Sequence, residues 1–219
     1  MGVSFKLIPM FTLSHEYSLK PAFASFILLN FGLLGISTVM HYQDTTIFFY
    51  VFVISIGTGI FVYLFQMYSI FKKRVRRKLD IGLKFSLIAF VFLGICVILG
   101  FIIALINPSG IKNFSLIYGY LIIFGYLSML IIGQLHKILP FLRWYHKYSS
   151  LAGKESVPML KDMYSEKIGY AIFYFMITGI IFLSFSFGLN FQIGVIISFI
   201  LFFIASILLL YNMMLVLKR

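Results

Sequence analysis

Six long apolar runs dominate the sequence, and none of them contains an acidic residue. Each run has about the 20 residues that a helix needs to cross the roughly 30 Å hydrocarbon core of a bilayer. The runs are continuous and do not alternate between apolar and polar residues, which favours helices over the strands of a membrane barrel. We therefore predict six transmembrane helices, at residues 22–41, 47–71, 82–106, 114–139, 169–188 and 192–217.

Composition excludes a water-soluble fold. Of the 219 residues, 62% are apolar and 11% are charged, whereas soluble domains have about 45–50% apolar and about 25% charged residues. A soluble fold of this length cannot bury so much apolar surface, so the bilayer must be the solvent. We predict an all-α polytopic membrane helical bundle. Residues 1–21 would form a cytoplasmic or interfacial segment, and residues 22–219 a single six-helix membrane domain.

The basic residues predict the orientation of the chain. All 18 Lys and Arg residues except Lys112 fall on one side of the six-helix arrangement, at the two termini and around the connections after the second and fourth helices. Because basic residues in short loops are retained in the cytoplasm, we predict a plasma-membrane protein with both termini cytoplasmic. The net charge of +12 then reflects topology and contact with anionic lipid headgroups, and we expect no nucleic-acid partner.

Two pairs of similar segments indicate an internal repeat. GVSFKLIPMFTLSH at 2–15 matches GQLHKILPFLRWYH at 133–146 in its Gly, Lys, Pro and His positions, and LFQMYSIFKK at 64–73 matches LYNMMLVLKR at 210–219. All four segments lie at predicted cytoplasmic ends of helices. The repeat is therefore predicted to be parallel, with an even number of helices in each unit.

The repeat has a consequence for the N-terminal segment. In the second unit the Gly-Lys-Pro motif ends the helix predicted at 114–139, because Pro140 lacks an N–H group and bends or ends a helix. In the first unit the same motif begins at residue 2, so we expect either a truncated chain or a partner polypeptide that supplies the upstream helices. The alternative is that residues 1–11 form only an interfacial anchor.

Ionisable and amide side chains within the membrane are the candidates for a site. His136 lies one to two turns inside the cytoplasmic end of its helix, where it is either an axial haem ligand or a hydrogen-bonded interfacial histidine. No second histidine faces it, since His41 lies at the opposite side of the membrane. We therefore expect no cofactor in this chain alone, and haem only together with a partner chain.

Four amides complete the candidates, and they either line a polar path or form hydrogen bonds between helices: Asn30, Gln66, Gln134 and Asn212. Gln134 is near His136 in sequence but on a different face of the helix, and Asn30 is the residue that we expect to face a partner. No zinc-type Cys/His spacing, phosphate loop, catalytic triad or carboxylate pair is present. We accordingly predict no catalytic residues and no metal ligands.

Three stretches carry a resemblance to a known group of proteins: GVSFKLIPMF (2–11), QMYSIFKKRVRRKLDIGLKF (66–85) and GQLHKILPFLRWYHKYSSLAGKESVPMLKDMYSE (133–166). Together they cover about a third of the chain, and they resemble multi-pass membrane proteins of the haem-copper-oxidase-subunit-I-like or NnrS-like type. In that group a His-rich helix with the candidate haem ligands precedes the GVSFKLIPMF equivalent, and this sequence lacks it. The resemblance thus implies a scaffold without those ligands.

Two functions follow as expectations. The first is an integral membrane scaffold or accessory protein of a haem, copper or nitric-oxide-related respiratory system, with a partner membrane chain or a second copy in a homo-oligomer. The second is a small-solute transporter or substrate-binding membrane subunit, because six helices with both ends cytoplasmic suit either function. The missing catalytic motifs argue against an enzyme.

Overall fold

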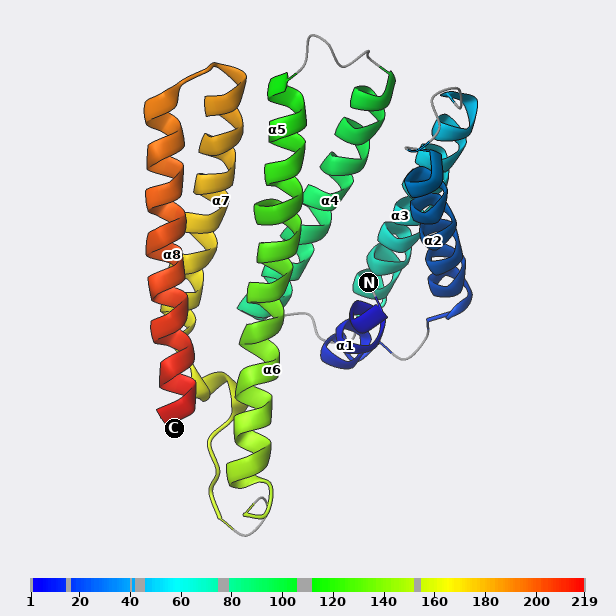
Figure 1. Cartoon of the computed structure of the whole chain (residues 1–219). Coiled ribbons are helices and arrows are strands. Elements are labelled where there is room, and N and C mark those ends of the chain that lie inside the picture. The colour runs from blue at the N-terminus through cyan, green and yellow to red at the C-terminus, as the bar shows by residue number, and fades with distance from the viewer. Residues whose placement is uncertain are drawn as a thin grey trace. The chain divides into compact units, whose positions relative to one another are not determined.

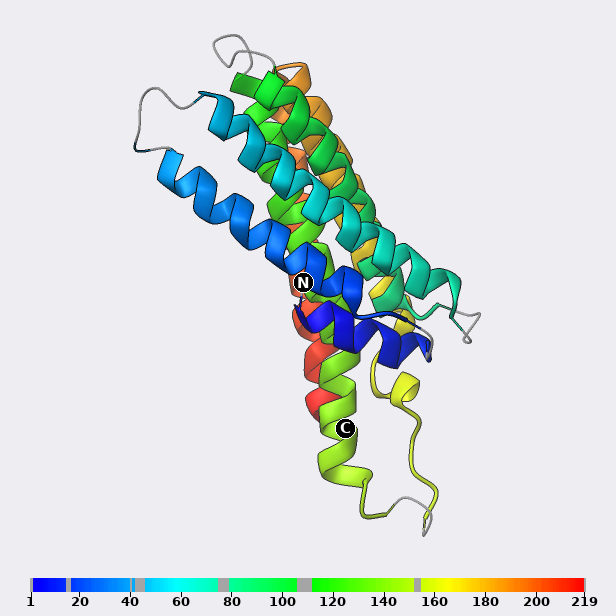
Figure 2. The ribbon, with the colours of Figure 1, turned by 90° about the vertical axis from the view of Figure 1, so that its right-hand side faces the viewer.

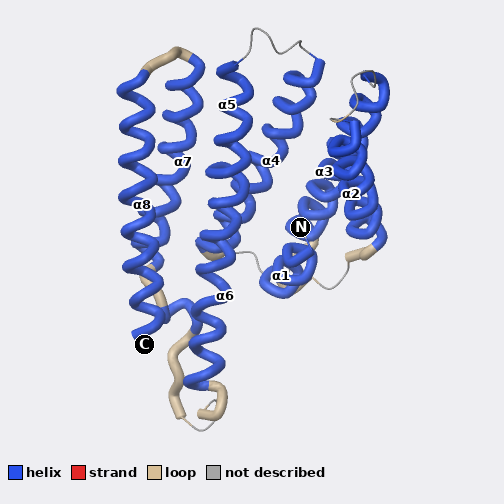
Figure 3. The backbone as a smooth tube through the Cα atoms, in the orientation of Figure 1, coloured by secondary structure: helices blue, strands red, loops and turns tan. Residues whose placement is uncertain are grey.

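The computed structural model of the chain describes residues 2–14, 17–39, 41, 46–74, 79–105, 112–151 and 155–218. Over these ranges the chain is built from helices joined by loops (Figures 1 and 3). Six helices are long and apolar enough to cross a membrane. This confirms the predicted all-α helical bundle with six apolar spans. The matched residue His15 lies outside the described ranges, as do the basic residues Arg76, Arg77, Lys78, Lys154 and Arg219.

Five of the six spans are single α-helices, and they begin and end within three residues of the predicted positions: α2 Lys20–Val39, α3 Thr46–Lys72, α4 Ile81–Leu105, α7 Glu166–Gly188 and α8 Gln192–Lys218. A shorter helix, α1 (Gly2–Thr12), precedes them, and a single 3-10 turn, η3 (Leu160–Met163), lies in the connection before α7. The apolar runs predict these helices well because a membrane helix satisfies all its backbone groups internally.

The fourth span differs from its predicted form. It joins α5 (Lys112–Tyr120), the π-helical segment η2 (Leu121–Ser128) and α6 (Met129–Tyr148). The predicted end of this helix at residue 139 is wrong, because α6 continues through Pro140 to Tyr148. One proline costs a helix about 3 kcal/mol. Beyond the proline, the indole of Trp144 donates to the carbonyl of Pro158 over 2.8 Å and ties α6 to the connection that follows it.

The apolar helix that contains α6 runs for 35 residues, or about 50 Å at 1.5 Å per residue. That length exceeds the hydrocarbon core, so one end of this helix must extend beyond it. Figures 1 and 2 both show the lower part of α6 continuing past the end of α8. The segment after Pro140 is thus available to support the connection that leads to α7.

The chain divides into two compact units. The first contains residues 1–78 and 94–111, and the second contains residues 79–93 and 112–219. Helix α4 contributes its first half to the second unit and its second half to the first. The candidate residues Asn30 and Gln66 belong to the first unit, whereas Gln134, His136 and Asn212 belong to the second.

Small residues set the helix packing in the first unit. Gly32 faces the backbone of α3, where an added Cβ would come within 3.0 Å of the carbonyl of Phe52. The hydroxyl of Ser55 donates to the carbonyl of Leu28 over 2.9 Å. Close approach of this kind is the usual way that membrane helices associate. Helix α1 packs on the same hairpin, with the ring of Phe5 edge-on to Tyr63 at 5.3 Å between centroids.

In the second unit the first half of α4 packs against α6 and α7. Gly82 and Gly133 meet so closely that a Cβ on either would lie 2.7 Å from the other's carbonyl oxygen. Between η2 and α8, Phe124 and Phe202 stack face to face at 4.6 Å. The contact between Gly82 and Gly133 places the start of α4 against α6 within one turn of His136.

Candidate functional site

His136 is buried in the second unit, with 1% of its surface exposed. Its ring stacks on Phe85 of α4 at 5.8 Å between centroids, with 18° between the planes. Tyr164 lies edge-on to it at 5.6 Å. Gly169 of α7 lies beside the ring, where an added Cβ would be in ordinary contact with the Nε2 atom at 3.6 Å. The imidazole therefore sits in a closed pocket of aromatic rings and backbone.

Hydrogen bonds assign the tautomer of this imidazole. The Nδ1 atom is 2.8 Å from the carbonyl oxygen of Ile132, and a carbonyl can only accept, so Nδ1 carries the hydrogen. The Nε2 atom is 3.3 Å from the Nδ2 atom of Asn212 on α8. In the neutral ring Nε2 is an acceptor, and the amide donates to it. Both ring nitrogens are thus engaged.

Asn212 has no exposed surface, and its remaining groups bond to Ser165. The backbone N–H of Ser165 donates to Oδ1 over 2.9 Å, and Nδ2 also donates to the Ser165 carbonyl over 3.3 Å. Ser165 is the N-cap of α7, since its hydroxyl accepts from the N–H of Ile168. We call His136, Asn212 and Ser165 the inner clamp. It joins α6, the start of α7 and α8 through a set of satisfied polar groups.

The inner clamp does not fit an axial haem ligand. For Nε2 to reach an iron, Asn212 would have to leave it, and the buried amide would lose a partner at a cost of about 1–3 kcal/mol. Phe85 and Tyr164 occupy the space around the ring. Within the described ranges, no group of three or more His, Cys, Asp or Glu side chains could hold a metal ion. In this structure both ring nitrogens of His136 form hydrogen bonds within the protein.

Gln134 forms its hydrogen bond with α4, whereas His136 forms one with α8. This agrees with the prediction that the two residues lie on different faces of their helix. Its Nε2 donates to the hydroxyl of Ser86 on α4 over 3.2 Å, and Ser86 donates to the carbonyl of Gly82. The Oε1 atom of Gln134 is buried and has no hydrogen-bond partner among the described residues. This oxygen is an unused acceptor between α4 and α6.

Two lysines lie near the inner clamp and have different partners. Lys137, next to His136 on α6, forms an ion pair with Asp80. Lys84, one turn into α4, donates from Nζ to the hydroxyl of Tyr170 on α7 over 2.8 Å. The same ammonium lies 4.7 Å from the centre of the Tyr170 ring. The sequence places Lys84 near the membrane boundary but gives no sign that Tyr170 is its partner.

The two amides of the first unit behave differently from each other. Gln66 is buried and donates from Nε2 to the carbonyl of Ser18 over 2.8 Å. Asn30 is exposed in the middle of α2, and its Nδ2 donates to the carbonyl of Phe26 in the same helix over 2.8 Å. The structure therefore does not gather the four candidate amides at one site.

Gln66 and Asn212 nevertheless have equivalent roles, and this supports the predicted repeat. Each lies near the end of the second helix of a hairpin and bonds the backbone just before the first helix, at Ser18 or Ser165. Helices α3 and α8 both have 27 residues. The same 146 positions separate the starts of α2 and α7 and the starts of α3 and α8. The internal repeat and the parallel orientation of its two halves stay predictions.

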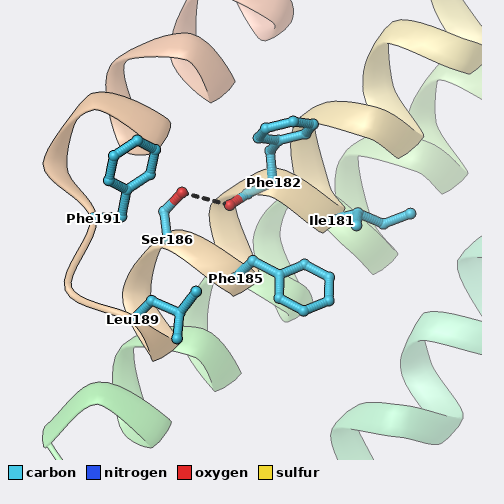
Figure 4. Close-up of a pocket in the computed structure, with 6 residues that line it drawn as sticks. All are labelled: Ile181, Phe182, Phe185, Ser186, Leu189 and Phe191. Atoms are coloured by element: carbon cyan, nitrogen blue, oxygen red, sulfur yellow. Dashed lines mark hydrogen bonds between the residues drawn. The ribbon is translucent and has the colours of Figure 1, made fainter.

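A separate hollow lies at the other end of the second unit, where α7 turns into α8 (Figure 4). Its volume is about 380 Å³, and it is lined by Ile181, Phe182, Phe185, Ser186, Leu189 and Phe191. The hydroxyl of Ser186 donates to the carbonyl of Phe182 over 2.6 Å. The lining is almost wholly apolar, so it offers contact to a hydrocarbon chain and no polar recognition.

Comparisons with protein families, with curated proteins and with solved structures give no match for this chain. The likeness to haem-copper-oxidase-subunit-I-like or NnrS-like proteins accordingly stays a prediction from the sequence.

Proposed function

We propose that this chain is an integral membrane scaffold or accessory protein, which acts by holding other components rather than by chemistry of its own. The observation that carries the proposal is the inner clamp. The best candidate for a cofactor ligand, His136, uses both ring nitrogens to hold α6 against α8 and the start of α7. A buried ionisable residue in a membrane is a functional candidate by default, and here its bonds are those of a structural residue.

The setting that we propose is a haem, copper or nitric-oxide-related respiratory system, in the plasma membrane and with both termini cytoplasmic. The sequence resemblance supports the setting, and the one-sided distribution of basic residues supports the orientation. In this proposal the redox groups belong to a partner membrane chain. This chain would contribute helices against which the partner packs.

The exposed amide of Asn30 is the reason to propose that a partner packs against α2, either a different membrane chain or a second copy. An amide exposed at mid-helix has unused hydrogen-bonding capacity in a place where lipid offers none. One of its N–H groups is satisfied by Phe26, which leaves the Oδ1 atom and the second N–H for another helix. Such bonds between membrane helices are worth about 0.6–2 kcal/mol each.

Capture of the native complex tests this proposal. The tagged chain is isolated from its own membranes in a mild detergent, and the eluate is analysed for co-purifying membrane proteins and for a Soret band. We expect a partner chain, and a Soret band only in fractions that contain it. A chain that elutes alone and is functional as an isolated transporter would contradict the scaffold.

A small-solute transporter or solute-binding subunit is the second candidate, and Gln134 is the observation that favours it. Its buried Oε1 atom has no partner within the described part of the chain, and a solute with an N–H or O–H donor could bind there. Substitution Gln134→Leu should then abolish specific solute binding to the purified colourless protein. Binding that is unchanged by Gln134→Leu would remove the reason for this candidate.

A further inference from the structure

We propose that Lys84 and Tyr170 form a binding site for the phosphate of an anionic phospholipid at the boundary of the membrane. The two residues lie at matching depth, because Lys84 is one turn into α4 and Tyr170 is one turn into α7. Both belong to the second unit, and both side chains are half-buried. This site is separate from the inner clamp and does not depend on the scaffold proposal.

The hydrogen bonds at this pair leave only donors unused. The ammonium of Lys84 has three N–H groups, and one donates to the hydroxyl oxygen of Tyr170. Because that hydroxyl accepts from Lys84, its own O–H is left to donate to another group. No acceptor for it, and none for the remaining N–H groups of Lys84, is found among the described residues.

The charge at this pair is also unbalanced. Lys84 has no ion pair with a carboxylate in the described part of the chain, whereas Asp80, one turn before it, is paired with Lys137. Glu166 lies one turn before Tyr170 on α7, but it is exposed and forms no ion pair with Lys84. Lys167 is exposed on the same turn and adds positive charge. A phosphate oxygen would supply both the negative charge and the missing acceptor.

A lipid headgroup is the source that the position favours. Each helix enters the apolar region immediately after this turn, so a phosphate held by Lys84 and Tyr170 would have its acyl chains beside α4 and α7. Exposed apolar side chains follow on both helices, Val91 on α4 and Tyr174 on α7. A basic residue near the surface attracts anionic lipid by about 1 kcal/mol, or about fivefold in affinity.

The test measures phospholipid retained by the full-length chain. The protein is incorporated into bilayer discs of phosphatidylcholine with phosphatidylglycerol, released into detergent, and its bound lipids are counted by native mass spectrometry. We expect the wild type to retain phosphatidylglycerol in preference to phosphatidylcholine. Lys84→Gln should weaken retention by about fivefold, and Tyr170→Phe should weaken it without a change of charge.

Two control variants distinguish lipid binding at the Lys84–Tyr170 pair from general electrostatic attraction to the basic protein. Lys161→Gln removes the same charge from an exposed position in the connection before α7 and should leave retention unchanged. Lys84→Arg should restore it, which excludes misfolding as the cause. Equal losses in Lys84→Gln and Lys161→Gln, or retention unaffected by Tyr170→Phe, would overturn the proposal. Complete displacement of the lipid by inorganic phosphate would show that the site binds free phosphate rather than a phospholipid.

Discussion

Asn212 donates from its side-chain amide to the Nε2 atom of His136 over 3.3 Å, although 76 residues separate the two along the chain. The bond lies between buried side chains and joins α8 to α6. In this arrangement both ring nitrogens of His136 are hydrogen-bonded, so Asn212 would have to be displaced before Nε2 could bind a metal. The proposed role of the protein as a scaffold begins from this pair.

Loss of the Asn212 amide should destabilise the second unit. Asn212→Leu leaves Nε2 of His136 and the backbone N–H of Ser165 without their partner, at an expected cost of about 1–3 kcal/mol. The carbonyl of Ser165 still accepts from the N–H of Gly169. Thermal or denaturant unfolding in detergent measures the change. Asn30→Leu is the control, because Asn30 is exposed and bonds only within its own helix. Equal stability of the two variants would show that the inner clamp contributes nothing.

The six spans are predictable from the sequence because their signal is local: a run of apolar residues long enough for the bilayer. The end of the fourth span is not, because α6 continues through Pro140 and is bonded beyond it, from Trp144 to Pro158. His136 and Asn212 are each recognisable as candidates, but the sequence does not pair them. The faces by which distant helices meet depend on packing that no single apolar run encodes.

One signal in the sequence did point to the inner clamp. The alignment of Gln66 with Asn212 placed two amides at equivalent helix ends, and both turn out to bond the backbone before their hairpin's first helix. The partner residues, Ser18 and Ser165, were outside the matched segments. By contrast, no pattern pointed to Tyr170 as the partner of Lys84, since aromatic residues occur throughout the chain.

Two glycine substitutions should have opposite effects on stability, because one glycine lies at the close contact of α4 and α6 and the other lies in open space. Gly133→Ala places a Cβ 2.7 Å from the carbonyl oxygen of Gly82 and 2.9 Å from the Cβ of Phe85, so the helices must separate and stability should fall by about 1–3 kcal/mol. Gly119→Ala meets nothing within 4 Å. It should stabilise its helix by about 0.5–1 kcal/mol. Unfolding measurements on both variants check this, and a Gly133→Ala protein as stable as the wild type would contradict the described packing.

Asn30 should contact a second polypeptide in the native membrane. A photoreactive amino acid at position 30 is expected to form a protein adduct, either with another membrane chain or with a second copy, as mass spectrometry of the product would identify. Phe23 is a suitable comparison site, because it is exposed on the same helix near its start. Capture of lipid alone at position 30, from a protein that is monomeric in mild detergent, would refute a partner on this face.

The proposed orientation predicts which residues react from outside the cell. In a Cys96→Ala background, a cysteine at Leu189, in the turn between α7 and α8, should react with a membrane-impermeant thiol reagent in intact cells. A cysteine at Lys161 should react only after the membrane is opened. Both positions are exposed in the structure, so access to the reagent depends on the side of the membrane. Reaction of the Lys161 variant in intact cells would show that the chain has the opposite orientation.

Absorbance of the isolated chain after incubation with haem tests the central claim most directly. If His136 is a structural member of the inner clamp, the chain purified free of other subunits should show no stoichiometric Soret band. His136→Gln should leave the spectrum unchanged while it lowers stability. A stoichiometric Soret band in the wild type that disappears in His136→Gln would show instead that His136 binds haem iron, and would contradict the account.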